Sequence, residues 1–399
     1  MKILVVSHAG VLGVNRAIFQ ELALRERNFE VVIVVPERWK GDLIADLRFT
    51  PSPEDEGIRV IPLPVYFSGN GSLYFYARSV RKALGDWWPD FVFVDEEPWS
   101  LSALQIYWEF RNIPRTFFTK QNLKKRLPFP FEFLQRWIFA QSALAFSVAS
   151  EVTEVLRWKG FGGRVVELPH SYDPRRFRTL SASERAEGRL RLGIPVDARV
   201  IGYFGRLTPE KGIADLLAVM NGPVPPIPGR RIYFWVGNGP EALTVLRSRA
   251  SHPAGSIVYH EAIPHDEVGT TLALIDLLVL PSRTERNWKE QFGRILVEAW
   301  ACGAAVLGSD SGEIPRLIRL TGGGHVFHER NPDDLAARLT EALAPGDLEE
   351  KSAAGNAYVR ENLTHARVAE RLALELAPFI STREPAPKPR ESARDAARS

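Results

Sequence analysis

Two carboxylates with seven residues between them, Glu290 and Glu298, stand at a predicted strand-to-helix junction. The apolar runs 277–282 and 304–309 on either side are typical of buried strands, so the helix between them should also be largely buried. A charged side chain within the apolar stretch 295–300 is costly unless a polar group meets it. We therefore expect Glu298 to contact either a bound ligand or, as the alternative, a neighbouring backbone group or arginine.

The start of this predicted helix is a candidate anion site. Phe292, Gly293, Arg294 and Ile295 follow Glu290 closely in the sequence. The first backbone N–H groups of a helix have no partner within the helix, and the helix dipole favours negative charge beside them. A diphosphate is therefore a suitable ligand for this junction.

A second junction carries two cations. The apolar run 200–205 ends in a glycine and is followed by Arg206 and Lys211. Thr208 is typical of a helix N-cap and Pro209 of the first helical position. Open α/β sheets bind ligands at the carboxyl ends of their strands, and phosphate oxygens accept charge-assisted hydrogen bonds there. The alternative is an exposed basic helix start with no ligand.

Four motifs in this order resemble the GT4 family of glycosyltransferases, retaining enzymes of the GT-B fold. The motifs are Gly205-Arg206 with Glu210-Lys211-Gly212, then 236–240, then Glu290-x-Phe-Gly, then Glu298-Ala299. The match covers residues 199–330, and weaker similarity extends through the amino-terminal half. The resemblance implies an α/β chain with two doubly wound, Rossmann-like domains that face each other across a cleft. The second domain would hold a nucleotide-diphosphate-sugar donor, and the first would hold most of a glycan, lipid-linked or small-molecule acceptor.

The resemblance also implies how the reaction proceeds. The sugar is transferred with retention at the anomeric carbon, and negative charge grows on the departing diphosphate. Arg206, Lys211 and the N–H groups of residues 292–295 would stabilise that charge. Retaining GT-B enzymes typically use such cations and a helix dipole in place of a divalent ion. We therefore expect no metal and no cofactor besides the donor substrate.

Further residues receive roles from the same resemblance. Glu290 would bind sugar hydroxyls and orient the ring, and Glu298 would accept hydrogen bonds from the ribose hydroxyls. Asn238 would be a further donor-binding residue. Arg294 stands where an apolar residue is common, and it would either add a phosphate-binding cation or pair with Glu298 one turn on.

The first predicted strand ends in a glycine loop that contains Gly10 and Gly13. In similar enzymes this loop approaches the donor phosphates, although the family usually has two adjacent glycines where this chain has glycines three apart. Gly13 is therefore a donor-binding candidate. His8 precedes the loop, and a lone histidine at a strand end is more often part of hydrogen-bonded structure than of a catalytic site.

Three consecutive acids, Asp95, Glu96 and Glu97, directly follow the predicted strand 91–94. Many GT4 enzymes have a histidine at about this point. Clustered carboxylates repel one another and raise at least one pKa, so Glu97 is a second catalytic candidate for hydrogen bonding to hydroxyls or for proton transfer. The alternatives are an acidic cluster that stabilises a helix over 100–110, and a metal site, which the resemblance disfavours.

A basic and aromatic segment marks a possible contact with a membrane. Residues 117–133 contain four cations and five phenylalanines. Such a mixture suits an anionic bilayer or a lipid-diphosphate acceptor, so we expect peripheral membrane contact from Lys120 to Phe133, at the inner face of the plasma membrane. The alternative is aromatic packing in the first domain with lysines directed outward.

Composition agrees with a globular enzyme of two domains. The chain has 399 residues, of which 45% are hydrophobic and 25% charged, and no apolar run approaches the roughly 18 residues of a membrane span. Its first apolar run has four residues, too few for a signal peptide, so we expect a cytoplasmic protein. The single cysteine, Cys302, excludes disulfides within the chain. The net charge of +3 gives no reason to expect nucleic acid binding.

Predicted strands and helices alternate in both halves, as in parallel sheets with helical crossovers. The strands are 2–7, 29–35, 59–63, 91–94, 115–119, 143–148, 165–168, 200–204, 232–236, 257–260, 277–280, 304–308 and 325–327. We expect a first domain over 1–172, a linker over 173–198 and a second domain over 199–355. A helix within 356–380 should cross back to the first domain, and the tail 381–399 should be disordered.

The expected function is transfer of a sugar in cell-envelope or exopolysaccharide synthesis. Two alternatives stay open at this point. A nucleotide-sugar 2-epimerase or a phosphorylase has the same architecture, although the ordered set Arg206, Lys211, Glu290 and Glu298 favours transfer. A catalytically silent GT-B scaffold subunit would be indicated by a degraded donor site, and this site has all its motifs.

Overall fold

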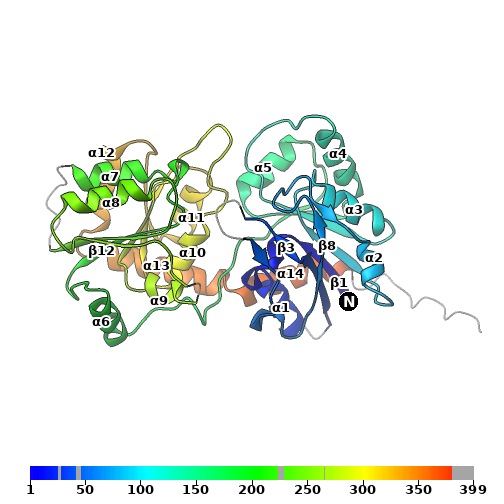
Figure 1. Cartoon of the computed structure of the whole chain (residues 1–399), viewed down its shortest axis with the longest axis horizontal. Coiled ribbons are helices and arrows are strands. Elements are labelled where there is room, and N and C mark those ends of the chain that lie inside the picture. Colours follow the sequence, from blue (N-terminus) through cyan, green and yellow to red (C-terminus); the bar gives the residue numbers. More distant parts are fainter. Residues whose placement is uncertain (26–27, 42–45, 223–228, 265, 380–399) are drawn as a thin grey trace, which may run out of the picture.

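The computed structural model describes residues 1–25, 28–41, 46–222, 229–264 and 266–379. Two α/β halves lie side by side along the longest axis of the molecule (Figure 1). The predicted disordered tail, 381–399, lies outside the described residues.

The first half is built on a seven-stranded parallel sheet with the order β11-β10-β9-β8-β1-β2-β5. Its strands are β1 (Lys2–Ser7), β2 (Glu30–Pro36), β5 (Arg59–Leu63), β8 (Phe91–Asp95), β9 (Arg115–Thr119), β10 (Leu144–Ser147) and β11 (Val165–Glu167). Ser7 pairs with Asp95 at the carboxyl ends of β1 and β8. The loops after these two strands are therefore neighbours.

The second half contains a six-stranded parallel sheet with the order β14-β13-β12-β15-β16-β17. Its strands are β12 (Arg199–Phe204), β13 (Arg231–Val236), β14 (Ile257–His260), β15 (Leu277–Leu280), β16 (Ala305–Ser309) and β17 (Gly324–Phe327). The predicted α/β class with two parallel sheets is thus confirmed, and each predicted strand has a counterpart.

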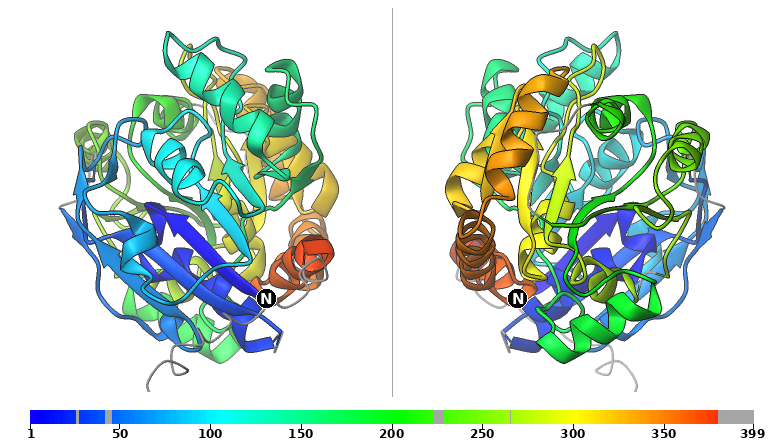
Figure 2. Two further views of the ribbon diagram at one scale, coloured as in Figure 1. Left: turned by 90° about the vertical axis from the view of Figure 1, so that its right-hand side faces the viewer. Right: turned by 90° about the vertical axis from the view of Figure 1, so that its left-hand side faces the viewer.

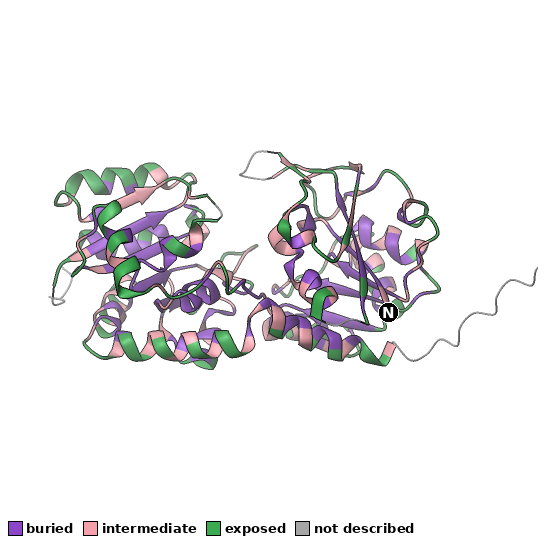
Figure 3. Ribbon diagram, turned by 90° about the horizontal axis from the view of Figure 1, so that it is seen from below, coloured by how far each residue is buried: buried purple, intermediate pink, exposed green. Residues whose placement is uncertain are grey.

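Helices connect the strands and cover both sheets. They are α1 (Ala17–Arg25), α2 (Val80–Ala83), α3 (Leu101–Glu109), α4 (Phe131–Gln141), α5 (Ser150–Trp158), α6 (Ala182–Arg191), α7 (Ile213–Asn221), α8 (Ala242–Ser251), α9 (Val268–Leu272), α10 (Arg294–Ala301), α11 (Ile314–Thr321), α12 (Pro332–Ala342), α13 (Asp347–Asn362) and α14 (His365–Leu376). The strands are buried while the outer helix faces are exposed (Figure 3). One apolar cluster includes residues of both sheets and of α14, so the two halves share part of their core.

Two short hairpins extend the carboxyl edge of the first sheet. One pairs β3 (Arg38–Trp39) with β4 (Leu47–Arg48), and the other pairs β6 (Val65–Tyr66) with β7 (Phe75–Tyr76). Neither was predicted, because strands of two residues are too short to show an alternating pattern.

Within the described residues, the chain passes between the halves twice. The segment predicted as a linker contains helix α6, whose first turn has a capping box formed by Ser181 and Glu184. The segment predicted as one helix that crosses back consists of the end of α13 and of α14, where Thr364 caps the first turn of α14. Helix α14 packs against α1, beside the amino-terminal strands (Figure 2).

Candidate active site

The carboxyl ends of the two sheets face a common cleft, which polar contacts bridge. Asn122 Nδ2 donates a hydrogen bond to the Glu290 carbonyl oxygen at 3.0 Å, and Lys289 forms an ion pair with Glu151. Two further contacts join Ser150 to Glu313 and Arg316 to Glu167. The two halves therefore meet closely beside the predicted donor site.

The structure brings Lys211 and Glu290 together. Lys211 Nζ lies 2.6 Å from Glu290 Oε2, and Ser282 Oγ donates to the same oxygen at 3.0 Å. Both charged side chains are largely buried, with 14% and 12% exposed, so solvent screens their interaction little. Lys211 Nζ also lies 4.7 Å from the ring centre of Trp288. Glu290 is thus fixed by a cation that sequence reasoning had assigned to the diphosphate.

The turn that positions Lys211 requires a glycine. Residues Pro209–Lys211 form a 3-10 turn with Thr208 as N-cap, and Gly212 follows with φ of 68°. A Cβ atom at Gly212 would lie 1.8 Å from the Pro281 carbonyl oxygen. Thr208 as N-cap and Pro209 as the first helical position are therefore confirmed for this 3-10 turn, whereas α7 begins only after the left-handed Gly212, at Ile213.

Arg206 and Asn238 lie at the carboxyl edge of the second sheet, in the loops that follow β12 and β13. The Arg206 side chain is 49% exposed and lies 3.4 Å from Glu210. Asn238 Nδ2 donates to Glu261 at 2.6 Å. The backbones after β12 and β13 approach so closely that a Cβ atom at Gly237 would lie 1.8 Å from the Gly205 carbonyl oxygen. The donor-binding roles of Arg206 and Asn238 stay predictions.

The first turn of α10 holds the remaining donor-site candidates. Gly293 is the left-handed N-cap with φ of 79°, and Arg294 Nε lies 3.0 Å from Glu298 Oε1. Burial raises the pKa of Glu298, and the Arg294 guanidinium offsets part of that effect. Phe292 is buried and Ile295 half-buried. Arg294 thus pairs with Glu298 in this structure, one of the two arrangements that the sequence left open.

Gly13 lies where a larger residue would collide with a neighbouring loop. A Cβ atom there would lie 2.4 Å from Ser52 Oγ. Buried Arg16 fixes the same loop: its Nη1 donates to the Gly10 carbonyl oxygen at 2.7 Å, and its Nε pairs with Asp55 at 2.6 Å. Close packing therefore explains this glycine without a ligand, and its donor-binding role stays a prediction.

Glu97 is held by the loop after β9. Thr119 Oγ1 donates to its Oε2 at 2.5 Å, and the Lys120 backbone N–H donates to its Oε1 at 2.8 Å. Burial raises the pKa of Glu97, while both hydrogen bonds act in the opposite direction. Helix α3 is capped by Ser100, whose Oγ accepts from the Ala103 N–H. The Glu97 side chain therefore anchors a loop, and its predicted catalytic role is not tested by these contacts.

Asp95 and Glu96 bind different partners. Asp95 accepts from Ser7 Oγ at 2.8 Å and pairs with Lys120 Nζ at 2.9 Å. Glu96 Oε2 lies 2.7 Å from His8 Nδ1. Sequence reasoning gave His8 little weight, because the contact depends on β1 and β8 being neighbours, and spacing along the chain does not reveal that adjacency.

A cavity of about 80 Å³ lies inside the cleft. The polar groups around it include Asp95, Lys120, His170, Arg294 and His365. Removal from water, reinforced by the cations Lys120 and Arg294, holds the pKa of His170 well below its usual value. Sequence reasoning missed His170, which follows the last strand of the first sheet with no motif around it. The cavity has room for a few water molecules, far less than the roughly 300–1,000 Å³ of a small-molecule site.

Comparison with known proteins shows what the second half of the chain is similar to. Residues 184–358 match the family model described as "Glycosyl transferases group 1". Over these residues, which are less than half of the chain, the protein is similar to the group 1 glycosyltransferases. A D-inositol 3-phosphate glycosyltransferase of Streptomyces bingchenggensis is 28% identical over 56% of this chain and 50% of its own length. A GDP-mannose-dependent monoacylated alpha-(1-6)-phosphatidylinositol monomannoside mannosyltransferase of Corynebacterium glutamicum is 28% identical over 51% of this chain and 54% of its own.

The chain spans about half the length of the curated relatives it matches. Among solved structures, sucrose-phosphate synthase from Thermosynechococcus elongatus is similar over 96% of this chain and 100% of its own, with a TM-score of 0.71 and 16% identity. Anabaena Alr3699/HepE in complex with UDP is similar over 95% and 100%, with a TM-score of 0.70 and 16% identity. These likenesses confirm the predicted GT-B fold.

Proposed function

We propose that the protein transfers a sugar from a nucleotide-diphosphate donor to a glycan, lipid-linked or small-molecule acceptor, with retention at the anomeric carbon. The observation that carries this proposal is the buried Lys211–Glu290 pair, 2.6 Å apart, at the approach to the first turn of α10. The Glu290 backbone also contacts the first half through Asn122. A sugar bound by Glu290 would therefore face the half that we expect to hold the acceptor.

The donor would lie along the carboxyl edge of the second sheet. The first-turn N–H groups of α10 would bind the diphosphate, and Lys211 and Arg206 would add positive charge. Lys211 would then lie between the Glu290 carboxylate and the leaving group. Such a bridge lets one cation both fix Glu290 and stabilise the charge that develops on the diphosphate.

Glu298 would bind the ribose hydroxyls either in place of its contact with Arg294 or together with it. Arg294 pairs with Glu298 at 3.0 Å, and its Nη1 also lies 3.4 Å from Asn15 Oδ1 across the cleft. An arginine has five N–H donors, so Arg294 can keep Glu298 while it donates to a phosphate oxygen. The two arrangements foreseen for Arg294 are therefore compatible in one complex.

A thermal-shift panel of UDP-, GDP-, ADP- and dTDP-sugars tests this function. A ligand at a hundred times its Kd stabilises the native state by about 2.7 kcal/mol, so the matching donor should raise Tm clearly. Lys211→Ala should raise the Kd of that donor about 10- to 100-fold, because the variant loses a charge-assisted hydrogen bond of roughly 1.5–3 kcal/mol. Lys351→Ala, which removes a half-buried cation paired with Glu350 far from the cleft, is the matched control.

Turnover should also persist in EDTA, because Lys211, Arg206 and the start of α10 would meet the diphosphate. Loss of activity in EDTA with recovery in Mg²⁺ or Mn²⁺ would contradict this arrangement. A panel in which no nucleotide sugar stabilises the protein would contradict the proposed function itself.

We further propose that a basic-aromatic patch, Lys124, Lys125, Arg126, Phe129 and Phe133, binds the anionic inner face of the plasma membrane. All five residues are exposed, and Phe129 and Phe133 are 88% and 64% exposed. Large exposed aromatics beside cations suit the boundary between lipid headgroups and acyl chains. Lys120, with which the predicted membrane segment begins, does not belong to this patch, because it pairs with Asp95 beside the cleft.

Sedimentation with lipid vesicles tests this contact. The protein should bind phosphatidylglycerol-containing vesicles and not pure phosphatidylcholine, and the double change Lys124→Glu and Lys125→Glu should abolish the binding. Equal binding to both kinds of vesicle would argue against the patch. No helix within the described residues is long and apolar enough to cross a membrane.

A further inference from the structure

A histidine and a buried carboxylate form a fixed pair on the first half of the molecule. His8 Nδ1 lies 2.7 Å from Glu96 Oε2, and the His8 backbone N–H donates to Glu96 Oε1 at 2.6 Å. The Tyr74 hydroxyl donates to the same Oε1. The Glu96 side chain is 1% exposed and that of His8 31% exposed. The carboxylate is thus enclosed while the imidazole reaches solvent.

Two aromatic rings fix the plane of the imidazole. The Trp39 ring centre lies 4.7 Å from that of His8 with an interplanar angle of 35°, and the Tyr74 ring meets it edge-on at 5.7 Å. Trp39 and Tyr74 themselves are 4.9 Å apart. Both come from the short hairpins at the carboxyl edge of the sheet. The ring is therefore held on its Nδ1 side and against one face.

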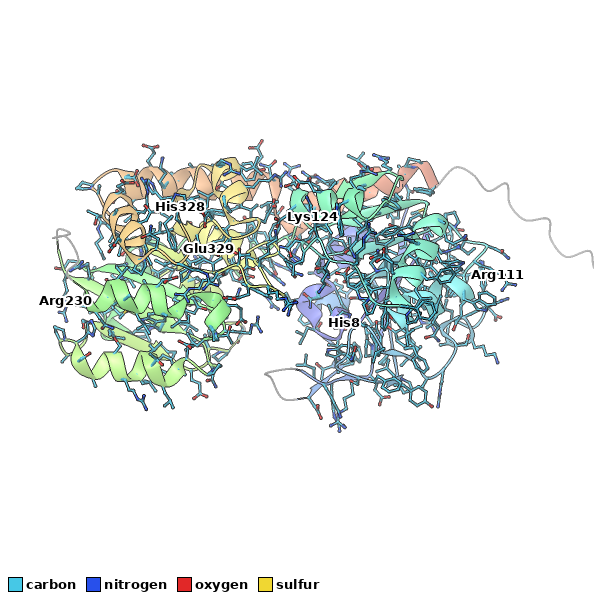
Figure 4. All side chains as sticks on the ribbon, turned by 90° about the horizontal axis from the view of Figure 1, so that it is seen from above. His8, Arg111, Lys124, Arg230, His328 and Glu329 are labelled. Carbon is cyan, nitrogen blue, oxygen red and sulfur yellow. The ribbon has the colours of Figure 1, made fainter. Side chains whose placement is uncertain are left out.

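The pair lies on the side of the first half that is turned toward the second. Figure 4 shows His8 at the border between the halves. Its neighbour Ala9 and the adjacent acid Asp95 line the cavity together with Arg294 from α10. His8 therefore lies next to residues that line this cavity, at the border of the cleft between the halves.

This geometry selects one form of the neutral imidazole. A carboxylate accepts only, so Nδ1 must carry the hydrogen that Glu96 binds, and the lone pair is left on Nε2. Among the residues that the structure describes, none hydrogen-bonds Nε2. A histidine oriented in this way by a buried acid is suited to accept a proton from a hydroxyl group.

We propose that His8 Nε2 binds the acceptor hydroxyl and removes its proton during sugar transfer, with Glu96 as its positioning residue. This inference rests on the proposed glycosyl transfer. The acceptor oxygen forms a bond to the anomeric carbon as the bond from that carbon to the diphosphate oxygen breaks. The electron pair of the broken bond leaves with the diphosphate, and the proton passes to Nε2 and then to solvent. The acceptor hydroxyl must lose this proton whatever the stereochemical course.

The surrounding charges give the step a pH dependence. Removal from water opposes a charge on His8, and Lys120 opposes it too, but Glu96 and Asp95 outweigh them and raise the pKa of His8 above its usual value. Tyr74 stays neutral because burial raises its pKa well above the ordinary value. Only unprotonated His8 accepts a proton, so kcat should rise with pH through the raised pKa and then level off.

Two substitutions separate the base from its positioning residue. His8→Gln should lower kcat on the order of 10²–10⁴-fold while donor Kd and Tm stay near the wild-type values. Glu96→Gln should lower kcat less and shift the acidic limb of the pH profile toward lower pH, because a carboxylate no longer raises the pKa of His8. His325→Gln is the matched control, since His325 forms a similar pair with Asp347 at 2.7 Å on the second half.

A nitrogen-15 NMR measurement of the His8 side chain adds a readout that needs no turnover. Neutral His8 should carry its hydrogen on Nδ1 in the wild type, and the Nε2–H form would overturn the proposal. Unchanged kcat in His8→Gln would also overturn it while the proposed function stands. A wild-type protein that transfers no sugar from any donor that binds would overturn the proposed function and the role of His8 together.

Discussion

At the scale of single residues, the acids beside the cleft are held in different ways, and the difference bears on which of them is available to a substrate. Glu290 forms an ion pair with Lys211, a cation that would also bind a phosphate. Glu298 forms an ion pair with Arg294, whose other N–H groups can bind a ligand at the same time. Glu97 has both oxygens engaged, one by a hydroxyl and one by a backbone N–H. Its partners cannot move without moving the loop after β9. Glu290 and Glu298 are therefore better placed to exchange partners for a ligand.

The variant Glu97→Gln distinguishes an anchor from a catalytic group. The amide keeps one acceptor oxygen, so the loop after β9 should lose one hydrogen bond and the protein about 1–3 kcal/mol of stability. The two contacts to Thr119 and Lys120 favour this result, with kcat nearly unchanged. Thermal unfolding, donor Kd and kcat should be measured on the same preparation. A large fall in kcat with normal Tm would instead establish the catalytic role predicted from the sequence.

At the scale of elements, short loops after the strands set the geometry of the site. The turn from β12 to α7 bends at Gly212, which packs against the end of β15. This contact joins the loop of Lys211 to the strand that leads toward Glu290. One glycine therefore fixes the relative positions of both members of the central ion pair.

Gly212→Ala should be severely destabilising. The added Cβ would collide with the Pro281 carbonyl oxygen, and its φ of 68° is also unfavourable for alanine. Gly193→Ala is a matched control, because Gly193 has φ of 67° and nothing within 4 Å of the added atom. The control should cost only about 1–2 kcal/mol, the left-handed penalty, and chemical denaturation should show a clearly larger loss for Gly212→Ala. Equal losses would mean that the close contact relaxes without cost.

The start of α14 should make stability depend on pH. His365 Nδ1 lies 2.8 Å from Ser171 Oγ, and burial lowers the pKa of His365 to about 4 from an ordinary 6.5. Between these values the unfolded chain binds a proton that the native state does not. The contribution of His365 to the free energy of unfolding should therefore be complete above pH 6.5 and should fall as the pH drops toward about 4. Below that pH it should fall no further, and the total loss should be up to about 3 kcal/mol. In His365→Gln this part of the pH dependence should disappear from urea titrations.

The sequence was most informative about the sheets and least informative about contacts between distant segments. Apolar runs such as Ile3–Val6 and Leu277–Leu280 predicted strands because both faces of a parallel sheet are buried. Motifs at strand ends located Lys211 and Glu290 for the same topological reason. His8 and Glu96 are 88 positions apart, and nothing local to either shows that their strands are neighbours. His170 likewise meets Phe292 and Arg294 only in the folded chain, because they come from the other half of the molecule.

At the scale of the whole molecule, polar contacts hold the two halves together across the cleft. Lys289 of the second half forms an ion pair with Glu151 of the first, and Asn122 of the first half donates a hydrogen bond to the Glu290 backbone. A separation of the halves would have to break these contacts. The two crossings of the chain, before α6 and at Thr364, are the places where such a motion can occur, because few other segments connect the sheets.

Reversing one charge across the cleft tests this motion. Glu151→Lys places two cations opposite each other where Lys289 now has an acid, so small-angle scattering should show a larger radius of gyration. Donor Kd should change only a few-fold, since the second half holds most of the donor, whereas kcat should fall because the two substrates no longer meet. Combining Glu151→Lys with Lys289→Glu restores opposite charges and should recover both compactness and kcat. A single variant with normal scattering and normal turnover would show that this ion pair does not control closure, and that the hydrogen bond at Asn122 and the shared apolar core suffice to hold the halves together.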